Sequence, residues 1–120
     1  MNIPLTPYSP LAGGRLTRDW NGDTLRDKYD QTVKEKYDMS KTIDYPIVKR
    51  VGEIAESKQI SRAQVAMSWL LQKDNVVPIV GGTKVKHLDE AISALDVTLS
   101  DEEIEYLEEL YQPHNIVGAL

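Results

Sequence analysis

A chain of 120 residues is long enough for one ordinary domain and too short for two substantial ones. Its 41% hydrophobic and 28% charged residues are typical of a globular protein and exclude a disordered one. The net charge of −5 comes with an acidic segment at 101–109 and no basic cluster, so nucleic-acid binding is not expected.

Several other classes of protein are excluded as well. The absence of cysteine rules out disulfides, thiolate catalysis and thiolate metal sites. Neither His87 nor His114 has a second ligand at a suitable spacing, so no metal site is expected. No apolar run approaches the roughly 18 residues of a membrane span, and no secretory leader opens the chain. We therefore expect a cytoplasmic protein that does not interact with membranes.

The chain opens with an apolar segment that prolines interrupt. We expect a short strand over Ile3–Leu5 that leaves its sheet near Pro7, because proline cannot donate to a sheet ladder. The Ala12–Gly14 turn follows, and its glycines are expected to expose backbone N–H groups. The polar segment 15–44 then predicts a long surface loop.

Two helices are predicted after this loop. The first begins at Tyr45-Pro46, with Asp44 as its N-cap, and ends at 57–59. The second begins after Ser61, and a glutamine three positions later completes a capping box. Its broad apolar surface predicts burial on more than one side. That surface comprises Val65, Ala66, Met67, Trp69, Leu70 and Leu71.

A second strand and two further helices complete the pattern. The segment Val76–Val80 is rich in β-branched residues and runs into Gly81-Gly82 and then a third helix. The third helix has an apolar face of Val85, Leu88, Ile92 and Leu95. Ser100 is expected to cap a fourth helix that Pro113 stops. Two strand–loop–helix units in series predict an α/β fold with parallel strands and right-handed crossovers.

Four motifs in this order resemble the aldo-keto reductases, a family of (β/α)8 barrels that use NADPH or NADH. The motifs are Pro7–Gly14, Ala63–Leu70, Pro78–Lys84 and Leu99–Ile104. The resemblance covers essentially all of residues 1–120 and is strongest to the bacterial and fungal branch that includes aryl-alcohol dehydrogenases. It extends only to the C-terminal part of the barrel. It therefore implies a partial (β/α)8 barrel: the last two parallel strands, their glycine turns and about four helices.

The resemblance implies cofactor binding without catalytic groups. The family's catalytic Asp, Tyr, Lys and His lie on earlier strands, so no residue of this chain is expected to be catalytic. Tyr8 matches the aromatic residue on which the nicotinamide ring stacks. The pyrophosphate loop is matched by Ser9, Leu11 and Gly13. The turn that holds the adenosine ribose and its 2′-phosphate is matched by Gly81, Gly82, Thr83 and Lys84.

Two positions depart from the family pattern at the adenosine end. His87 stands where many members carry an arginine that binds the 2′-phosphate, and a neutral histidine is a poorer phosphate partner. Glu90 matches an acidic residue that contacts the adenine, but Ala91 replaces an asparagine often found beside it. The resemblance thus implies NADP as cofactor and leaves NAD open.

Three readings of function remain open. The chain is part of an oxidoreductase that reduces an aldehyde or ketone or oxidises an alcohol; or it is a non-catalytic nucleotide-binding or regulatory module; or it is an inactive truncated paralogue. Under each reading the open barrel edge should leave Ile3, Leu5, Val77 and Ile79 poorly covered. We therefore expect self-association or marginal stability.

Overall fold

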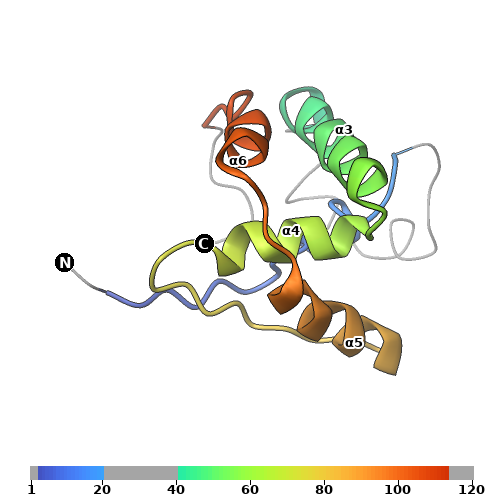
Figure 1. The fold of residues 1–120 in the computed structure, drawn as a ribbon, viewed down its shortest axis with the longest axis vertical. Coiled ribbons are helices and arrows are strands. Elements are labelled where there is room, and N and C mark those ends of the chain that lie inside the picture. Colours follow the sequence, from blue (N-terminus) through green and yellow to red (C-terminus); the bar gives the residue numbers. More distant parts are fainter. Residues whose placement is uncertain (1–2, 21–40, 114–120) are drawn as a thin grey trace.

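The computed structural model describes residues 3–20 and 41–113. Within these ranges it contains four α-helices and two short 3-10 helices (Figure 1). The elements in chain order are η1 (Ala12–Gly14), α3 (Lys41–Lys58), α4 (Arg62–Leu71), α5 (Val85–Ser93), η3 (Ala94–Asp96) and α6 (Asp101–Glu108). In Figure 1, α4 crosses the middle of the molecule, with α3 and α6 on one side and α5 on the other. None of the described helices is both long and apolar enough to cross a membrane.

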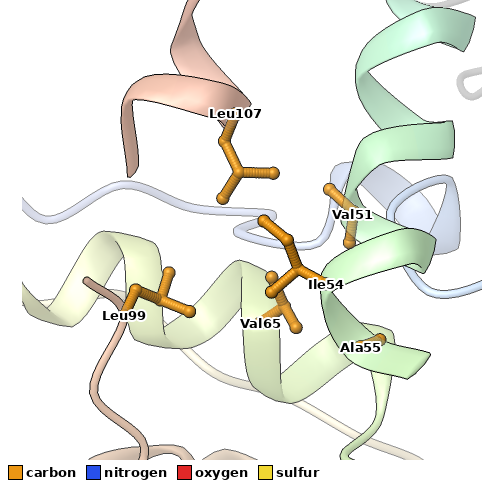
Figure 2. Close-up of a cluster of buried hydrophobic side chains, with 6 residues drawn as sticks. All are labelled: Val51, Ile54, Ala55, Val65, Leu99 and Leu107. Atoms are coloured by element: carbon orange, nitrogen blue, oxygen red, sulfur yellow. The ribbon is translucent and has the colours of Figure 1, made fainter. Parts of the chain in front are cut away.

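The hydrophobic core lies where α3, α4 and α6 meet (Figure 2). Its buried side chains are Val51, Ile54, Ala55, Val65, Leu99 and Leu107. Val65 of α4 is fully buried at 0% exposure. The expectation that α4 is covered on more than one side is confirmed, since α3, α5 and η3 all contact it. Most of the stability of such short helices comes from packing of this kind.

Ser68 of α4 and Gln72, the C-cap residue of that helix, hold the connector between η3 and α6. The Ser68 hydroxyl, at 0% exposure, donates to the carbonyl of Val97 at 2.8 Å. The Gln72 amide makes two bonds to the backbone of Leu99: its Nε2 donates to the carbonyl at 3.0 Å, and its Oε1 accepts from the N–H at 2.7 Å. In a sheet, a neighbouring strand would make these two backbone hydrogen bonds. Here the side-chain amide of Gln72 makes them instead.

Arg50 of α3 makes several of the contacts that hold α6 against α3. The guanidinium of Arg50 donates to the Tyr106 carbonyl at 2.7 Å and to Glu109 Oε2 at 3.0 Å. Its Cζ also lies 4.1 Å from the centre of the Tyr106 ring, within cation–π range. The Tyr106 hydroxyl donates to Glu53, and this hydrogen bond raises the pKa of Tyr106.

Helix α6 is held against α4 by one carboxylate. Glu108 accepts from Trp69 Nε1 at 2.8 Å and also pairs with Lys73. Lys73 Nζ lies 4.7 Å from the centre of the Trp69 ring, so the three side chains form one cluster. The hydrogen bond from Lys73 lowers the pKa of Glu108 below its ordinary value. The charged form of Glu108 is therefore the one that the folded chain favours.

The predicted starts of two helices are confirmed. Ser61 accepts from the Gln64 N–H at 3.1 Å, and the Gln64 side chain accepts from the Ser61 N–H at 2.8 Å. Ser100 and Glu103 form the same reciprocal pair at α6. Burial raises the pKa of Glu103, but the Ser100 N–H and Lys58 outweigh this effect and the net pKa is lowered.

The predicted end of α3 is also confirmed. The helix stops at Lys58, and Gln59 adopts a left-handed conformation with φ 56°. The Ile60 N–H donates to the Ala55 carbonyl at 3.0 Å and the Gln59 N–H to Glu56 at 3.2 Å. These two bonds define a Schellman motif, which satisfies carbonyls that the last turn of a helix otherwise leaves unpaired.

Two other predicted helix ends are wrong. Helix α3 begins at Lys41, so Asp44 is not its N-cap and Pro46 lies inside it. Pro46 is exposed, so water can reach the carbonyl whose helical hydrogen bond the proline removes. Helix α6 ends at Glu108 rather than at Pro113. The clustered carboxylates at 105–109 oppose the negative end of the helix dipole, which favours this earlier end.

The two predicted strands appear only as one parallel bridge, between Leu5 and Val76. The Leu5 N–H donates to the Asn75 carbonyl at 2.7 Å, and the Val77 N–H donates to Leu5 at 2.8 Å. The Ile79 N–H then donates to the Pro7 carbonyl at 2.9 Å. Pro7 has no N–H to donate to the Val77 carbonyl, so the ladder is interrupted between the Val77 and Ile79 bonds and only one bridge forms. The parallel direction is confirmed, but the described residues contain no regular strand and the barrel-like sheet is not seen.

The predicted loop 15–44 is only partly described, because 21–40 lie outside the described residues. Its last four residues are helical, as α3 shows. Its first six residues are packed: Trp20 Nε1 donates to the Arg15 carbonyl at 3.0 Å, and its ring lies 5.6 Å from that of Tyr45. Arg62 of α4 pairs with Asp19 at 2.9 Å. Residues 15–20 are therefore held against α3 and α4.

The expected exposure of the sheet residues is confirmed. Ile3, Leu5, Val77 and Ile79 are 58%, 59%, 61% and 55% exposed. The apolar face of α5 is exposed too, although its periodicity predicts burial. Parallel strands normally have both faces covered. The described chain thus combines a buried three-helix core with an uncovered strand pair and an uncovered helix face.

Replacement of Gln72 by leucine should destabilise the fold. Both backbone groups of Leu99 would lose their partners beside a 2% exposed side chain, which costs about 1–3 kcal/mol. Urea unfolding followed by circular dichroism measures the change. The control is Gln112→Leu, at an exposed position outside the helices. Equal unfolding midpoints for the two variants would contradict the assigned role of Gln72.

Stability should also fall at acid pH because of Glu108. Its folded pKa lies below the ordinary value of 4.5, so its contribution is complete above pH 4.5 and is lost as the pH falls through the folded pKa. For a pair this exposed, the contribution is about 0.2–1 kcal/mol. Unfolding free energies at pH 7 and pH 3.5 should therefore differ less in Glu108→Gln than in wild type. An unchanged difference would refute this assignment.

Candidate functional site

Two glycine-containing turns leave the parallel strand pair at the same end. The Ile79 N–H to Pro7 carbonyl bond, at 2.9 Å, is the last contact of the pair. The chain continues on one side into Tyr8 and η1, and on the other into Gly81-Gly82. Parallel strands place their carboxyl ends at one edge, and ligands of α/β folds commonly bind there. The two turns that carry the predicted site residues therefore begin at the same end of the strand pair.

The first turn has an unusual backbone. Ser9, Ala12, Gly13 and Gly14 all have positive φ, from 51° to 94°. Such a run is sterically costly for residues with a Cβ, and two of the four are glycine. The N–H groups of Ala12 and Gly14 donate to Ser9 at 2.9 Å and to Leu11 at 3.0 Å. The expectation that this turn exposes its N–H groups is therefore wrong for these two residues, whose donors close the turn instead.

The second turn runs into a helix start that no side chain caps. Lys84 is the N-cap residue of α5 and makes no capping hydrogen bond. The first turn of α5 contains no acidic residue, and it carries the exposed Lys86 and His87. Positive charge beside the positive end of a helix dipole is unfavourable for the isolated helix and favourable for binding an anion. By contrast, α4 and α6 of the same chain both begin with a capping box.

His87 is positioned by contact with Gly82. A Cβ placed on Gly82 would lie 2.6 Å from His87 Cβ and 3.2 Å from its Nδ1, so only glycine fits beside this side chain. A Cβ on Gly81 would meet nothing within 4 Å. The two glycines therefore differ: Gly82 is required by close packing, whereas Gly81 is not.

The other predicted residues are distributed over the same end. The Tyr8 side chain is 64% exposed, and Thr83 is exposed as well. Leu11 and Gly13 are half-buried within the first turn, and Glu90 is half-buried on α5. The described residues contain no group of three potential metal ligands, so nothing in them indicates a metal centre.

The structure adds basic residues that the sequence reasoning missed. Lys86 lies in the first turn of α5, next to Lys84 and His87. Arg18 Nη1 contacts the Gly14 carbonyl at 3.4 Å, and Arg15 is buried at 8% exposure beside the first turn. A search for basic residues within a few positions of each glycine turn would have found all three.

Comparison with known proteins decides the family. The Aldo/keto reductase family model matches residues 1–112. The chain belongs to the aldo/keto reductase family. This membership implies a (β/α)8 barrel for the complete fold, although the described residues show four α-helices and a single β-bridge.

Individual relatives agree with this assignment. The chain is 40% identical over 116 residues to the versiconal hemiacetal acetate reductase of Aspergillus parasiticus, covering 95% of this chain and 34% of that protein. It is 44% identical over 113 residues to "Putative aryl-alcohol dehydrogenase AAD16" of Saccharomyces cerevisiae, covering 93% and 33%. It is 32% identical over 121 residues to aldo-keto reductase yakc [NADP(+)] of Schizosaccharomyces pombe, covering 98% and 36%. The chain spans about a third of the length of these relatives.

The two glycines of the second turn should respond differently to alanine. Gly82→Ala forces the His87 side chain away and should destabilise the chain by on the order of 1 kcal/mol. Gly81→Ala meets no neighbour, so its effect should stay within about 0.5 kcal/mol. Urea unfolding of both variants measures the difference. Equal effects would contradict the contact between Gly82 and His87.

Proposed function

We propose that this chain is the NAD(P)H-binding part of an aldo-keto reductase-like oxidoreductase. The observation that carries the proposal is the bond between the Ile79 N–H and the Pro7 carbonyl. It sets two glycine turns at one edge, and one of them enters an uncapped helix start. A dinucleotide has two separate parts joined by a pyrophosphate, and two turns that leave a strand pair at the same end suit such a ligand.

The proposal assigns the first turn to the nicotinamide end. The exposed ring of Tyr8 would stack on the nicotinamide, and the backbone around Ser9, Leu11 and Gly13 would hold the pyrophosphate. The nearby Arg18 adds positive charge on this side. Because the N–H groups of Ala12 and Gly14 already have partners, Arg18 becomes more important for the pyrophosphate than the sequence alone indicates.

The second turn is assigned to the adenosine end. Gly81, Gly82, Thr83 and Lys84 would surround the ribose and its 2′-phosphate, and Glu90 would contact the adenine. The uncapped N-terminus of α5 offers N–H groups to an anion, Lys84 and Lys86 offer positive charge, and His87 offers its ring nitrogens. These groups fit a phosphate, which supports NADP over NAD, and one relative carries NADP(+) in its name. His87 in place of an arginine weakens the preference.

The proposed role is binding rather than chemistry. When bound, the cofactor supplies a hydride to an aldehyde or ketone, or accepts one from an alcohol. No described residue is assigned to proton transfer, and the proposal places the catalytic groups of the complete barrel outside this chain. A cytoplasmic location is part of the same proposal. Because the chain presents part of a site, its own affinity should be weak.

A titration with NADPH, followed by its fluorescence, tests the proposal. We expect weak saturable binding that Lys84→Ala reduces severalfold, through loss of one charge–phosphate contact. Lys49→Ala, at an exposed position in the middle of α3, is the control and should bind as wild type does. NADH should bind more weakly than NADPH in the wild type. Lys84→Ala should reduce this difference in affinity between the two cofactors.

The same protein should not oxidise NADPH in the presence of 4-nitrobenzaldehyde. Binding without turnover supports the proposal. Turnover by the chain alone would show that the catalytic groups are not missing, and absence of any binding would favour an inactive truncated paralogue.

A further inference from the structure

In the described part of the chain, the half-buried residues of α5 all lie in its last turn. Residues 85–89 are exposed, whereas Glu90, Ala91 and Ser93 are half-buried. Ala94 follows in η3 at 1% exposure, and both α5 and η3 contact α4. The direction of α5 is therefore set largely at the end opposite to the second turn.

One glutamine joins the start of α4 to this last turn. Gln64 Nε2 donates to Ser93 Oγ at 2.8 Å, and the Ser93 hydroxyl donates to the Glu90 carbonyl at 2.9 Å. The other amide atom, Oε1, accepts from the Ser61 N–H at 2.8 Å in the capping box of α4. Because the cap takes the oxygen, the amide presents its N–H donors to Ser93. The hydrogen bonds therefore run in one direction, from α4 to the backbone of α5.

A small change in the direction of α5 has a large effect at its other end. A helix of nine residues is about 13 Å long, so a tilt of roughly 10° about its C-terminal end displaces its first N–H groups by about 2 Å. N–H···O bonds span only about 2.7–3.2 Å, so a displacement of this size breaks them. The bond between Gln64 and Ser93 thus bears on the donors at the second turn.

We propose that Gln64 is a positioning residue for the adenosine end of the nucleotide site. Through Ser93 it sets the direction in which α5 presents its N-terminal N–H groups, Lys84 and Glu90 to the ribose 2′-phosphate and the adenine. Gln64 acts through Ser93 and is not assigned a contact with the nucleotide. This role rests on the proposed function. It concerns bonds within the chain, so it needs no covering partner.

Loss of this bond should alter the site more than the stability of the fold. No residue of α5 is among the described side chains of the hydrophobic core. The buried Ala94, and the bond from Ser68 to the Val97 carbonyl, still hold the residues that follow α5. A variant that lacks the Ser93 hydroxyl should therefore lose little stability, while α5 becomes free to tilt.

Ser93→Ala and Ser57→Ala form a matched pair of variants. Both hydroxyls donate to the backbone carbonyl three residues earlier, at 2.9 Å for Ser93 and 3.0 Å for Ser57. Ser57 lies near the end of α3, whereas Ser93 also accepts from Gln64 of another helix. The control therefore removes the local bond without removing the link between α4 and α5.

Spin labels measure the direction of α5 without any ligand. The chain has no cysteine, so Lys49→Cys and Lys86→Cys place one label on α3 and one on α5, both at exposed positions. Pulsed electron paramagnetic resonance should give the same narrow distance distribution in the labelled parent and in Ser57→Ala. Ser93→Ala should broaden this distribution or shift its centre by about 2 Å.

Two halves of the cofactor test binding at the two turns separately. The probe 2′,5′-ADP carries the adenine and the 2′-phosphate, and reduced nicotinamide mononucleotide carries the other end. In titrations followed by NMR, Ser93→Ala should weaken 2′,5′-ADP binding about threefold to tenfold, which corresponds to one hydrogen bond, and change mononucleotide binding less than about twofold. Ser93→Thr keeps the hydroxyl and should restore most of the affinity. Gln64→Ala should act as Ser93→Ala does, and the double variant should bind no more weakly, because both changes break the same bond.

These measurements separate failure of this role from failure of the proposed function. If wild type binds 2′,5′-ADP and Ser93→Ala binds it as Ser57→Ala does, Gln64 is not a positioning residue, although the proposed function stands. Equal loss of both probes in Ser93→Ala, or an unchanged distance distribution, would also overturn the role. A wild type that binds neither probe would remove the proposed function, and the role of Gln64 in the site would fall with it.

Discussion

The arrangement of this chain depends on the contact between α4 and the connector that follows η3. The Gln72 amide satisfies both backbone groups of Leu99, and Ser68 satisfies the carbonyl of Val97 from a fully buried position. These bonds hold residues 97–99, between η3 and α6, against α4 and its C-cap residue. The core around Val65 lies between the helices that this connector joins and their neighbour α3. Without a partner for its backbone, this connector could not lie against the core.

The same contact explains why the described fold is dominated by helices. The connector takes its hydrogen bonds from side chains of α4, so it does not need a sheet. The strand pair has no such support: it consists of one bridge and one further bond, and its apolar side chains are more than half exposed. Two parallel strands cannot bury both of their faces against the helices available. In the described part of this chain the helices therefore pack against one another without a sheet, whereas the family's barrel contains both helices and a sheet.

Sequence patterns within a few residues predicted the starts of α4 and α6 correctly. They did not predict that the apolar face of α5 is exposed. The capping boxes at Ser61 and Ser100 depend on residues three positions apart, and the left-handed end of α3 at Gln59 is equally local. Pro7 also lies where the strand pair was predicted to end: it cannot donate to the Val77 carbonyl, and its own carbonyl accepts the last bond of the pair. The start of α3 was missed because helix packing tolerates Pro46 near an exposed N-terminal turn. The exposure of α5 could not be predicted, because an apolar face indicates only what a helix could bury and not whether a neighbour is present.

The candidate site was predictable for a similar reason. Glycine positions and the lysine at the helix start are read directly from the sequence, and the parallel direction of the strands places both turns at one end. What the sequence could not supply is the state of the backbone donors. The N–H groups of Ala12 and Gly14 close their own turn, and the N-terminus of α5 has no cap. The two turns thus offer different kinds of contact: the first presents side chains and shape, and the second presents unpaired helix donors with nearby positive charge.

The position of the site relative to the core has an energetic consequence. The three-helix core lies on one side of α4 and α5 lies on the other (Figure 1), where the apolar side chains of α5 are exposed. Regions with few buried contacts open at lower free energy than the core does. The site can therefore be disordered while α3, α4 and α6 remain packed. A ligand that binds only the ordered form must supply the free energy of ordering, which lowers its apparent affinity. Anything that covers the strand pair or α5 would lower that cost and raise the apparent affinity.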